Sequence, residues 1–173
     1  MVSNIVVLGI NRDMTRQVAE ILSEQLEMHF LDTIELFEFD NIPRSFSDIL
    51  KTQGERYFRE KEKSLTGYVS SFDNTVIHAE SGSVIKSKNI KKFKEHCLII
   101  YIHYPASMIK KILGEKKYDT VELKKFFNIS IDRVQRRIGL LKKQSDIVVT
   151  GSGKSSLKIT SEILRSIDNY YLK

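Results

Sequence analysis

The stretch Asn4-Ile-Val-Val-Leu-Gly-Ile-Asn-Arg-Asp-Met-Thr-Arg16 decides the fold. A short apolar run that ends in Gly9 is typical of a buried parallel strand entering a tight turn. From Val18 to Leu26, apolar residues recur at helical spacing. A strand, a turn and a helix in this order have the geometry of a phosphate-binding loop.

The residues that such a loop needs for its chemistry are mostly replaced. A working loop of the form G-x-x-x-x-G-K-[S/T] surrounds the phosphates with backbone N–H groups and a lysine, and its hydroxyl holds magnesium. Gly9 occupies the first position. Met14, Thr15 and Arg16 stand where the second glycine, the lysine and the hydroxyl residue are expected. Met14 thereby places a side chain where the backbone should face phosphate.

Other residues bear on phosphate binding in opposite ways. Asp13 adds a negative charge to the loop, whereas Arg12, Arg16 and Lys154 are basic residues that could replace the missing lysine. The stretch Gly151-Ser152-Gly153-Lys154-Ser155-Ser156 looks like half of a second phosphate loop, but its first glycine is replaced by Val148. We therefore interpret this stretch as a glycine-rich connection to the last helix.

Length and composition indicate one ordinary domain. The chain has 173 residues, of which 41% are hydrophobic and 29% charged, and no proline-rich or glycine-serine linker divides it, so we expect a single domain over residues 1–173. No apolar stretch approaches the about 18 residues that cross a membrane. No basic segment precedes the first strand, so a signal peptide is not expected and the cytoplasm is the expected location.

The chain is basic, with a formal net charge of +6 and a pI of about 9.3. This charge is compatible with affinity for anions such as a nucleotide, a phosphorylated metabolite or nucleic acid. The lysine clusters are interpreted first as solvated helix faces, and they comprise Lys86–Lys94, Lys110–Lys117, Lys124–Lys125 and Lys142–Lys143. Because no basic motif with interleaved aromatic residues is present, a nucleic-acid module is not expected.

Cys97 lies in an apolar run and is expected in the core.

Short apolar runs alternate with helical patterns along the chain. The expected strands are Ile5–Leu8, His29–Leu31, Thr75–His78, Leu98–His103 and Asp146–Thr150. The expected helices lie near Thr15–Glu27, Phe46–Lys51, Arg56–Ser70, Lys88–Lys94, Ala106–Leu113, Ser130–Lys143 and Ser156–Tyr171. This alternation predicts an α/β fold whose parallel sheet is covered on both faces and binds ligands at the carboxyl ends of its strands.

Several residues are candidates for a binding site. Asp32 ends the second strand, where it can hold a magnesium shell, or it can cap a helix that starts at Thr33. Arg59 can grip a carboxylate in bidentate fashion, with an exposed salt bridge as the alternative. The turn around Gly82 lets a ligand approach the backbone, and Arg137 alone is one more basic helix residue. The four histidines have no metal-ligand spacing, so we expect structural roles for them.

Taken together, these pieces resemble the shikimate kinases over nearly the whole chain. The stretches that carry the resemblance are Asn4–Gly9, Phe30–Thr33, Asp48–Glu62, Val76–Val84 and Asp146–Thr150. The resemblance implies a P-loop, nucleoside-monophosphate-kinase-like fold: a three-layer α/β sandwich with a five-stranded parallel sheet and a lid at about residues 114–128. That family transfers the γ-phosphate of ATP to the 3-hydroxyl of shikimate, with magnesium.

The resemblance assigns roles only where this chain matches the family. Asp32 matches the first aspartate of a D-x-D motif, which implies a water-mediated magnesium contact, while Ile34 replaces the second aspartate, which grips the shikimate hydroxyls. Arg59 lies in the most specific block, Gly54-Glu55-x-x-Phe58-Arg59-x-x-Glu62, which forms a wall of the shikimate pocket in that family. Arg59 and Arg137 match arginines that bind the substrate carboxylate, and Gly82 remains from a G-G-G turn.

The carboxylate-binding residues are thus kept, whereas the loop lysine and hydroxyl are absent and Tyr118-Asp119 replaces the lid's Arg-Pro. We therefore favour a shikimate-kinase-like protein without normal turnover, whose pocket takes a small carboxylate such as shikimate. No catalytic residue is assigned, and ATP and magnesium are expected only if the kinase reaction persists. A divergent active shikimate kinase and a basic anion- or nucleic-acid-binding protein are the alternatives. The sequence does not specify an oligomeric state.

Overall fold

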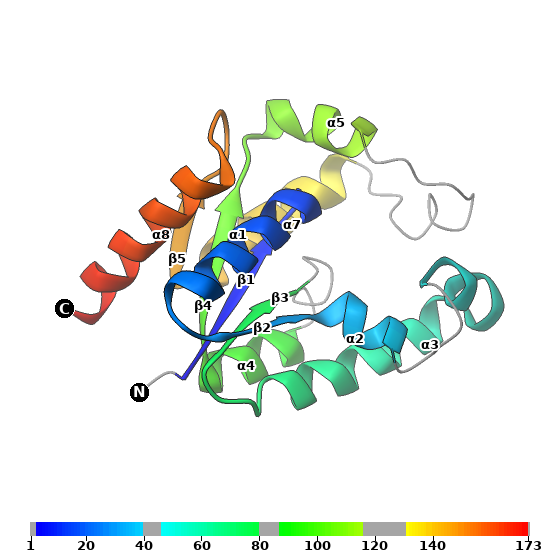
Figure 1. The fold of residues 1–173 in the computed structure, drawn as a ribbon. Coiled ribbons are helices and arrows are strands. Elements are labelled where there is room, and N and C mark those ends of the chain that lie inside the picture. Colours follow the sequence, from blue (N-terminus) through cyan, green and yellow to red (C-terminus); the bar gives the residue numbers. More distant parts are fainter. Residues whose placement is uncertain (1–2, 40–45, 80–86, 116–130, 173) are drawn as a thin grey trace.

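The computed structural model describes residues 3–39, 46–79, 87–115 and 131–172, and for several residues inside the helices it describes the backbone alone. Strands and helices alternate as the sequence predicts (Figure 1). The strands are β1 (Asn4–Gly9), β2 (His29–Asp32), β3 (Thr75–His78), β4 (Cys97–His103) and β5 (Ile147–Thr150). The helices are α1 (Arg12–Gln25), α2 (Thr33–Phe39), α3 (Phe46–Val69), α4 (Ser87–His96), α5 (Ala106–Glu115), α7 (Ile131–Gln144) and α8 (Ser156–Tyr171).

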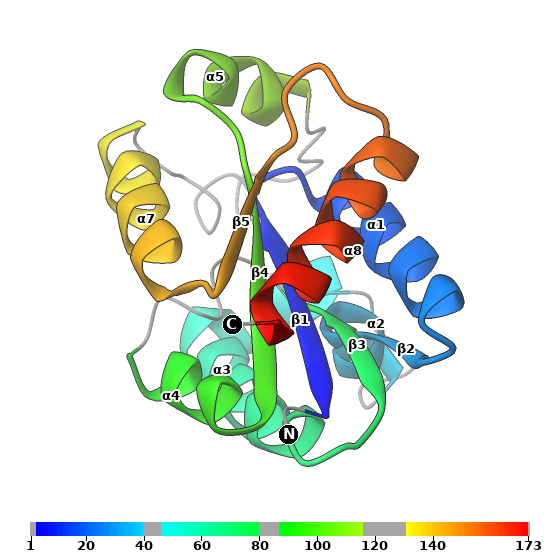
Figure 2. The ribbon, with the colours of Figure 1, turned by 90° about the vertical axis from the view of Figure 1, so that its left-hand side faces the viewer.

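The strands form one parallel five-stranded sheet in the order β2-β3-β1-β4-β5 (Figure 2). In its centre, Ile5 of β1 pairs with Val76 of β3 on one side and with Leu98 of β4 on the other. The carboxyl ends of all strands therefore meet at one edge of the sheet. The connections that leave β1 and β4 run in opposite directions, which marks the switch point where sheets of this kind bind ligands.

Helices cover both faces of the sheet, which confirms the predicted three-layer α/β fold (Figure 2). On one face, α1 and α8 pack against each other, with Val18 and Ile163 fully buried in the first core. On the other face, α3, α4 and α7 cover the second core, which contains Phe93 and Leu141. Apolar burial contributes about 25 cal/mol per Å², and these two cores fix the strand ends that hold the site.

The observed boundaries follow the predicted ones, with two informative differences. The chain is helical from Arg12 onward, although the apolar spacing predicts a start near Thr15. The predicted helices Phe46–Lys51 and Arg56–Ser70 belong to one element, α3, which bends at Gly54. Gly54 has φ 76° and ψ 173°, a conformation that glycine adopts without steric cost. The predicted interruption is therefore a kink and not a loop.

Cys97 opens β4 and is buried in the second core, as expected for a core cysteine. Burial raises the pKa of its thiol to about 12, so the thiol stays protonated at neutral pH. None of the described helices is both long and apolar enough to cross a membrane. The predicted lid at about residues 114–128 lies almost wholly outside the described residues.

Candidate functional site

The carboxyl edge of the sheet holds a buried charged cluster centred on Asp32. Asp32 ends β2, and its side chain has no solvent exposure. Its register partner on β3 is His78, whose Nδ1 lies 2.9 Å from Asp32 Oδ2. The other ring nitrogen, His78 Nε2, lies 3.0 Å from Thr15 Oγ1. Residues from α1, β2 and β3 are therefore joined in one chain of polar contacts.

Two arginines of α1 complete this cluster. Arg12 Nη2 lies 3.2 Å from Asp32 Oδ2 and 3.4 Å from Oδ1, and Arg16 Nη1 lies 3.5 Å from Oδ2. Arg16 Nε also lies 3.0 Å from Glu20 Oε1, and its Nη1 pairs with Glu35 of α2. The guanidinium groups thus tie α1 to β2 and α2, and only their outer sides reach solvent.

Asp32 is also the N-cap of α2. Its Oδ1 accepts hydrogen bonds from Ile34 N at 2.7 Å and from Glu35 N at 3.3 Å. Burial alone would raise the pKa of Asp32, but the hydrogen bond and charge of His78, the charge of Arg12 and the Ile34 amide together lower it to about 2. Asp32 is therefore an anion at neutral pH, and the capping role that the sequence left open is observed.

The turn between β1 and α1 consists of Ile10 and Asn11. Asn11 has an extended backbone and caps α1, because its Oδ1 accepts a hydrogen bond from Met14 N at 3.3 Å. Thr15 N donates to Asn11 O at 2.9 Å. These two amides belong to the positions that would face phosphate in a working loop, and both are bonded within the protein. The Met14 side chain packs against the first core.

Close packing around Gly9 leaves no room for a side chain at this position. A Cβ atom on Gly9 would lie 2.2 Å from Thr15 Cγ2 and 3.2 Å from Ile102 O, so the close approach of α1 to the sheet requires glycine. The Thr15 hydroxyl lies 2.9 Å from Arg12 O and 3.0 Å from Asn11 O, as a donor within the helix would. Thr15 therefore fills the space between Gly9 and His78.

Tyr104 fills the space next to the switch point, between the turns that follow β1 and β5. It is 3% exposed, and a Cβ atom on Gly151 would lie 2.5 Å from its Cζ atom. Burial raises the pKa of Tyr104, and the nearby Asn11 side chain partly opposes that rise. Within the described part of the chain, its hydroxyl has no hydrogen bond of good geometry.

The other predicted site residues are only partly placed. Asp13 is exposed in the first turn of α1. Lys154 does not approach the cluster, because its Nζ is bonded to Glu162 Oε2 at 2.6 Å. Arg59 lies on α3 and Arg137 on α7, but their side chains, like all of Gly82, lie outside the described residues. The carboxylate pocket that these three residues would form therefore stays a prediction.

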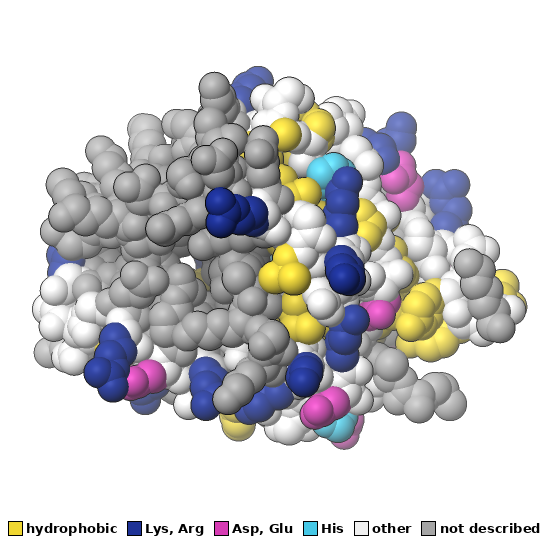
Figure 3. Space-filling model, turned by 180° about the vertical axis from the view of Figure 1, so that it is seen from behind, with side chains coloured by type: hydrophobic (Ala, Val, Ile, Leu, Met, Phe, Trp, Pro, Cys, Tyr) yellow, Lys and Arg dark blue, Asp and Glu magenta, His cyan; other side chains and the backbone are white. Residues whose placement is uncertain are grey.

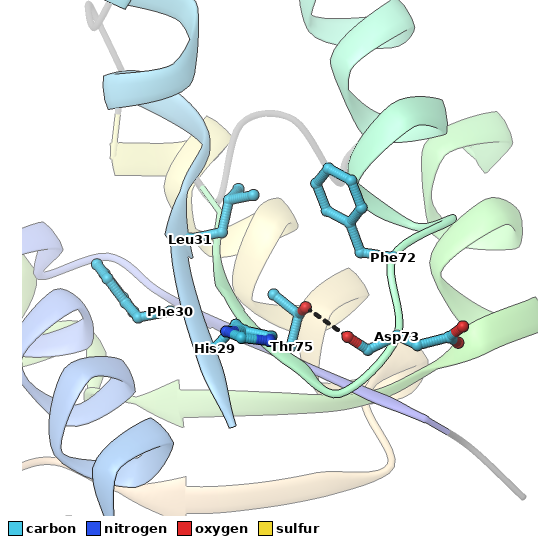
Figure 4. A pocket seen from close by; sticks show the side chains of 6 residues that line it. All are labelled: His29, Phe30, Leu31, Phe72, Asp73 and Thr75. Carbon is cyan, nitrogen blue, oxygen red and sulfur yellow. Dashed lines mark hydrogen bonds between the residues drawn. The ribbon is translucent and has the colours of Figure 1, made fainter. Parts of the chain in front are cut away.

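One pocket lies away from this edge. It has a volume of about 260 Å³ and is lined by His29, Phe30, Leu31, Phe72, Asp73 and Thr75 (Figure 4). His29 and Thr75 are the first residues of β2 and β3, so the pocket is at the amino ends of these strands. Thr75 Oγ1 already donates to Asp73 O at 2.9 Å. Ligands of parallel α/β sheets bind at the opposite edge, so we do not assign a site here.

Sequence reasoning missed His78 as a member of the cluster. In the sequence it is one of four histidines without ligand spacing, and only the register of β2 with β3 brings it to Asp32. It also missed Asn11 as the cap of α1, although an asparagine that precedes a helix is a recognised capping signal. Glu35 pairs with Arg16 from α2, a helix that the sequence offered only as one of two explanations of Asp32.

Comparisons with known proteins place this geometry in a family context. The family model described as shikimate kinase matches residues 16–168. A shikimate kinase of Clostridium botulinum (strain ATCC 19397 / Type A) is 30% identical over 89% of this chain and 91% of its own length. A shikimate kinase of Persephonella marina is 27% identical over 95% of this chain and 98% of its own length. The solved structure of the shikimate kinase from Acinetobacter baumannii in complex with shikimate has a TM-score of 0.82 at 18% identity, covering 100% of this chain and 97% of the other. The Aquifex aeolicus shikimate kinase has a TM-score of 0.77 at 22% identity, covering 98% of both chains. These two structures support the fold.

Proposed function

This chain belongs to the shikimate kinase family, and from that premise we propose that it binds a small carboxylate such as shikimate without normal ATP-dependent phosphoryl transfer. The observation that carries the proposal is the set of hydrogen-bond donors that surrounds the Asp32 carboxylate. This residue is where the family resemblance expects a magnesium contact, and its carboxylate is enclosed by donors from the protein itself.

The donor set around Asp32 does not fit magnesium. A carboxylate has about four lone-pair sites, and those of Asp32 face Ile34 N, His78 Nδ1 and the Arg12 guanidinium, with Glu35 N and Arg16 slightly farther away. Two fixed positive charges beside the carboxylate would also repel a divalent cation. We therefore expect Arg12 and Arg16 to neutralise Asp32 in place of a metal ion, and no reaction step is assigned to magnesium.

The start of α1 supports the absence of phosphate binding. A phosphate loop offers several free backbone N–H groups to the anion, but here Met14 N–H and Thr15 N–H are bonded to Asn11. The position of the expected lysine is occupied by Thr15, whose hydroxyl contacts His78. Removing a single electrostatic contact to a transition state typically costs about 3–4 kcal/mol, and here the lysine and the metal would be missing together.

The proposed carboxylate pocket rests on three residues taken from the resemblance. Arg59 and Arg137 lie on α3 and α7, two of the helices that cover one face of the sheet, and Gly82 follows β3. An arginine holds a carboxylate with two parallel hydrogen bonds, which gives affinity without any metal. In this proposal the pocket persists as a binding site and the phosphoryl-transfer chemistry does not.

The test is calorimetric titration with ATP–magnesium and with shikimate, together with a coupled kinase assay. We expect heat from shikimate, none from ATP–magnesium and no turnover. Arg59→Ala should abolish the shikimate signal, whereas Arg56→Ala, an exposed position on the same helix, should leave it unchanged. Robust ATP-dependent turnover would establish the alternative, a divergent active kinase, and would overturn the proposal.

A gain-of-function variant sharpens the test. Restoring the loop requires Met14→Gly, Thr15→Lys and Arg16→Ser, and Arg12→Gly removes the second guanidinium from Asp32. If these side chains are what prevents binding, the fourfold variant should acquire affinity for ATP–magnesium. A folded variant that still ignores the nucleotide would show that the block lies elsewhere.

A further inference from the structure

Some basic side chains of this protein are paired and others are not. Arg12 and Arg16 pair with Asp32, and Lys154 pairs with Glu162. Six basic side chains described on α4 and α7 have no ion-pair partner among the described residues, as is also the case for Lys51 and Lys61 on α3 and for Lys158 and Arg165 on α8. The six share one side of the molecule; we call them the α4–α7 face, and they are Lys91, Lys92, Lys94, Arg136, Lys142 and Lys143.

The two helices present these residues on one side of the molecule. Phe93 of α4 and Leu141 of α7 both pack into the second core, so both helices cover the same face of the sheet. Figure 3 views the molecule from that side, and in its described part basic side chains cover more surface than acidic ones, with apolar side chains between them. All six residues are exposed except Lys92, which is partly buried.

Among the described residues, acidic side chains near this face are fewer than basic ones, and Glu60 of α3 lines one pocket together with Lys92. Glu95 is the acidic residue described on the two helices. Asp146, which follows α7, accepts a hydrogen bond from Ile99 N at 2.8 Å. A lysine in the last turn of a helix stabilises the helix dipole, which accounts for Lys94, Lys142 and Lys143. It does not account for Lys91 and Arg136, which lie nearer the middle of their helices.

We propose that the α4–α7 face binds the phosphate backbone of nucleic acid without reading its sequence. A row of regularly spaced single negative charges is the partner that a set of unpaired, flexible cations fits best. None of the exposed large hydrophobic side chains described belongs to α4 or α7, although Val148 of β5 and Tyr68 of α3 are exposed on neighbouring elements. A protein partner would need an apolar centre. An anionic membrane also attracts basic side chains, and the vesicle measurement below separates it from nucleic acid.

The surface is separate from the site around Asp32. The last turns of α4 and α7 lead directly into the amino ends of β4 and β5, while Asp32 lies at the carboxyl end of β2. Arg136 is the neighbour of Arg137, a residue of the proposed carboxylate pocket, on α7, so the variant below leaves Arg136 unchanged and alters four lysines of the face. This choice makes the two proposals independently testable.

The test is fluorescence anisotropy with a labelled 20-base-pair duplex and a 20-nucleotide single strand, both of arbitrary sequence, over a range of KCl concentrations. For the full chain we expect a Kd of roughly 10⁻⁴–10⁻⁶ M that weakens steeply with salt. The variant Lys91→Gln, Lys94→Gln, Lys142→Gln, Lys143→Gln should bind at least tenfold more weakly. Its log–log salt slope should fall by roughly 3, since each phosphate contact contributes about 0.9 on a duplex and about 0.7 on a single strand.

The matched control removes the same charge elsewhere. Lys51→Gln, Lys61→Gln, Lys158→Gln, Arg165→Gln changes exposed positions on α3 and α8, and its salt slope should stay within about 1 of the full chain. Equal losses in both variants would mean that net charge alone drives binding, which would overturn the proposal. Comparable affinity for polyglutamate or for phosphatidylserine vesicles would overturn the nucleic-acid assignment. An unchanged melting temperature and unchanged shikimate titration of the first variant would assign its loss to this surface.

Discussion

Two strand–turn–helix units of this molecule are built alike and carry different chemistry. β1 with α1 and β5 with α8 each have a glycine at the strand end and a polar cap, Asn11 or Ser155, before the helix. The two helices pack against each other on one face of the sheet. In the first unit the charges converge on buried Asp32, whereas the second has a partly exposed pair, Lys154 with Glu162.

This difference shows which part of such a unit sets the fold and which part sets the chemistry. The glycine, the cap and the apolar face of the helix are shared, so they account for the common backbone path. The side chains of the first helical turn are not shared, and in the first unit they build an enclosed ion cluster. The variants below test this separation, from the largest expected effect to the smallest.

Asp32→Asn should have the largest effect. Removing one partner of a buried ion pair typically costs about 3–5 kcal/mol of unfolding free energy. Here Arg12 would lose the carboxylate beside it, whereas Arg16 would keep Glu20 and Glu35. The corresponding change in the second unit, Glu162→Gln, should have no measurable effect, because that pair reaches solvent. Urea denaturation of both variants measures this contrast, and equal losses would contradict it.

The stability of the protein should depend on pH at low pH because of Asp32 in the first unit. The pKa of Asp32 is lowered in the folded state from 3.8 to about 2. Its stabilisation is therefore fully present above pH about 4 and is lost as the pH falls towards 2, with a contribution of about 2 kcal/mol. Thermal denaturation between pH 2 and 5 should show this loss in the wild type. The Asp32→Asn variant should show a flatter curve, and two parallel curves would refute the assignment.

Substitution of the glycine at each strand end, Gly9 or Gly151, should destabilise both units in the same way. A Cβ atom on Gly9 would meet Thr15 Cγ2 at 2.2 Å, and one on Gly151 would meet Tyr104 Cζ at 2.5 Å. Overpacking of this kind typically costs about 1–3 kcal/mol, so Gly9→Ala and Gly151→Ala should destabilise the protein to a similar extent. Chemical denaturation measures both. A loss confined to one unit would mean that the close approach matters in that unit alone.

The helix caps should give the smallest effects. Asn11→Ala removes the acceptor of Met14 N–H, and Ser155→Ala removes the acceptor of Lys158 N–H. Each loss typically costs about 1 kcal/mol, and the two melting temperatures should fall by similar amounts. A clearly larger fall for Asn11→Ala would indicate that the Asn11 cap also supports the cluster around Asp32.

Much of the fold was predictable because it depends on local patterns. The apolar runs placed all five strands, and the alternation with helices predicted the parallel sheet. The helix that starts at Thr33 was one of two alternatives offered for Asp32. The interruption near Gly54 was expected from the sequence, although it is a kink. Helix caps and glycines act over a few residues, so they can be recognised in a single sequence. The cap at Asn11 was nevertheless overlooked, and the start of α1 was therefore predicted too late.

The site was less predictable because it depends on contacts between distant residues. Asp32, Arg12 and Arg16 were candidates, but nothing in the sequence indicated that both arginines reach the same carboxylate. His78 joins them only through the pairing of β2 with β3. Lys154 was a candidate for the missing lysine and instead pairs with Glu162, one helix away from the cluster.

The burial of Cys97 has a practical consequence for all of these experiments. It is the chain's single cysteine, and its thiol is enclosed and protonated at neutral pH. A cysteine introduced at an exposed position, such as Ser161→Cys on α8, would then be the one thiol that a maleimide dye or a nitroxide spin label modifies. Site-selective spectroscopy therefore needs no cysteine-free background, and storage of the purified protein needs little protection against intermolecular disulfides.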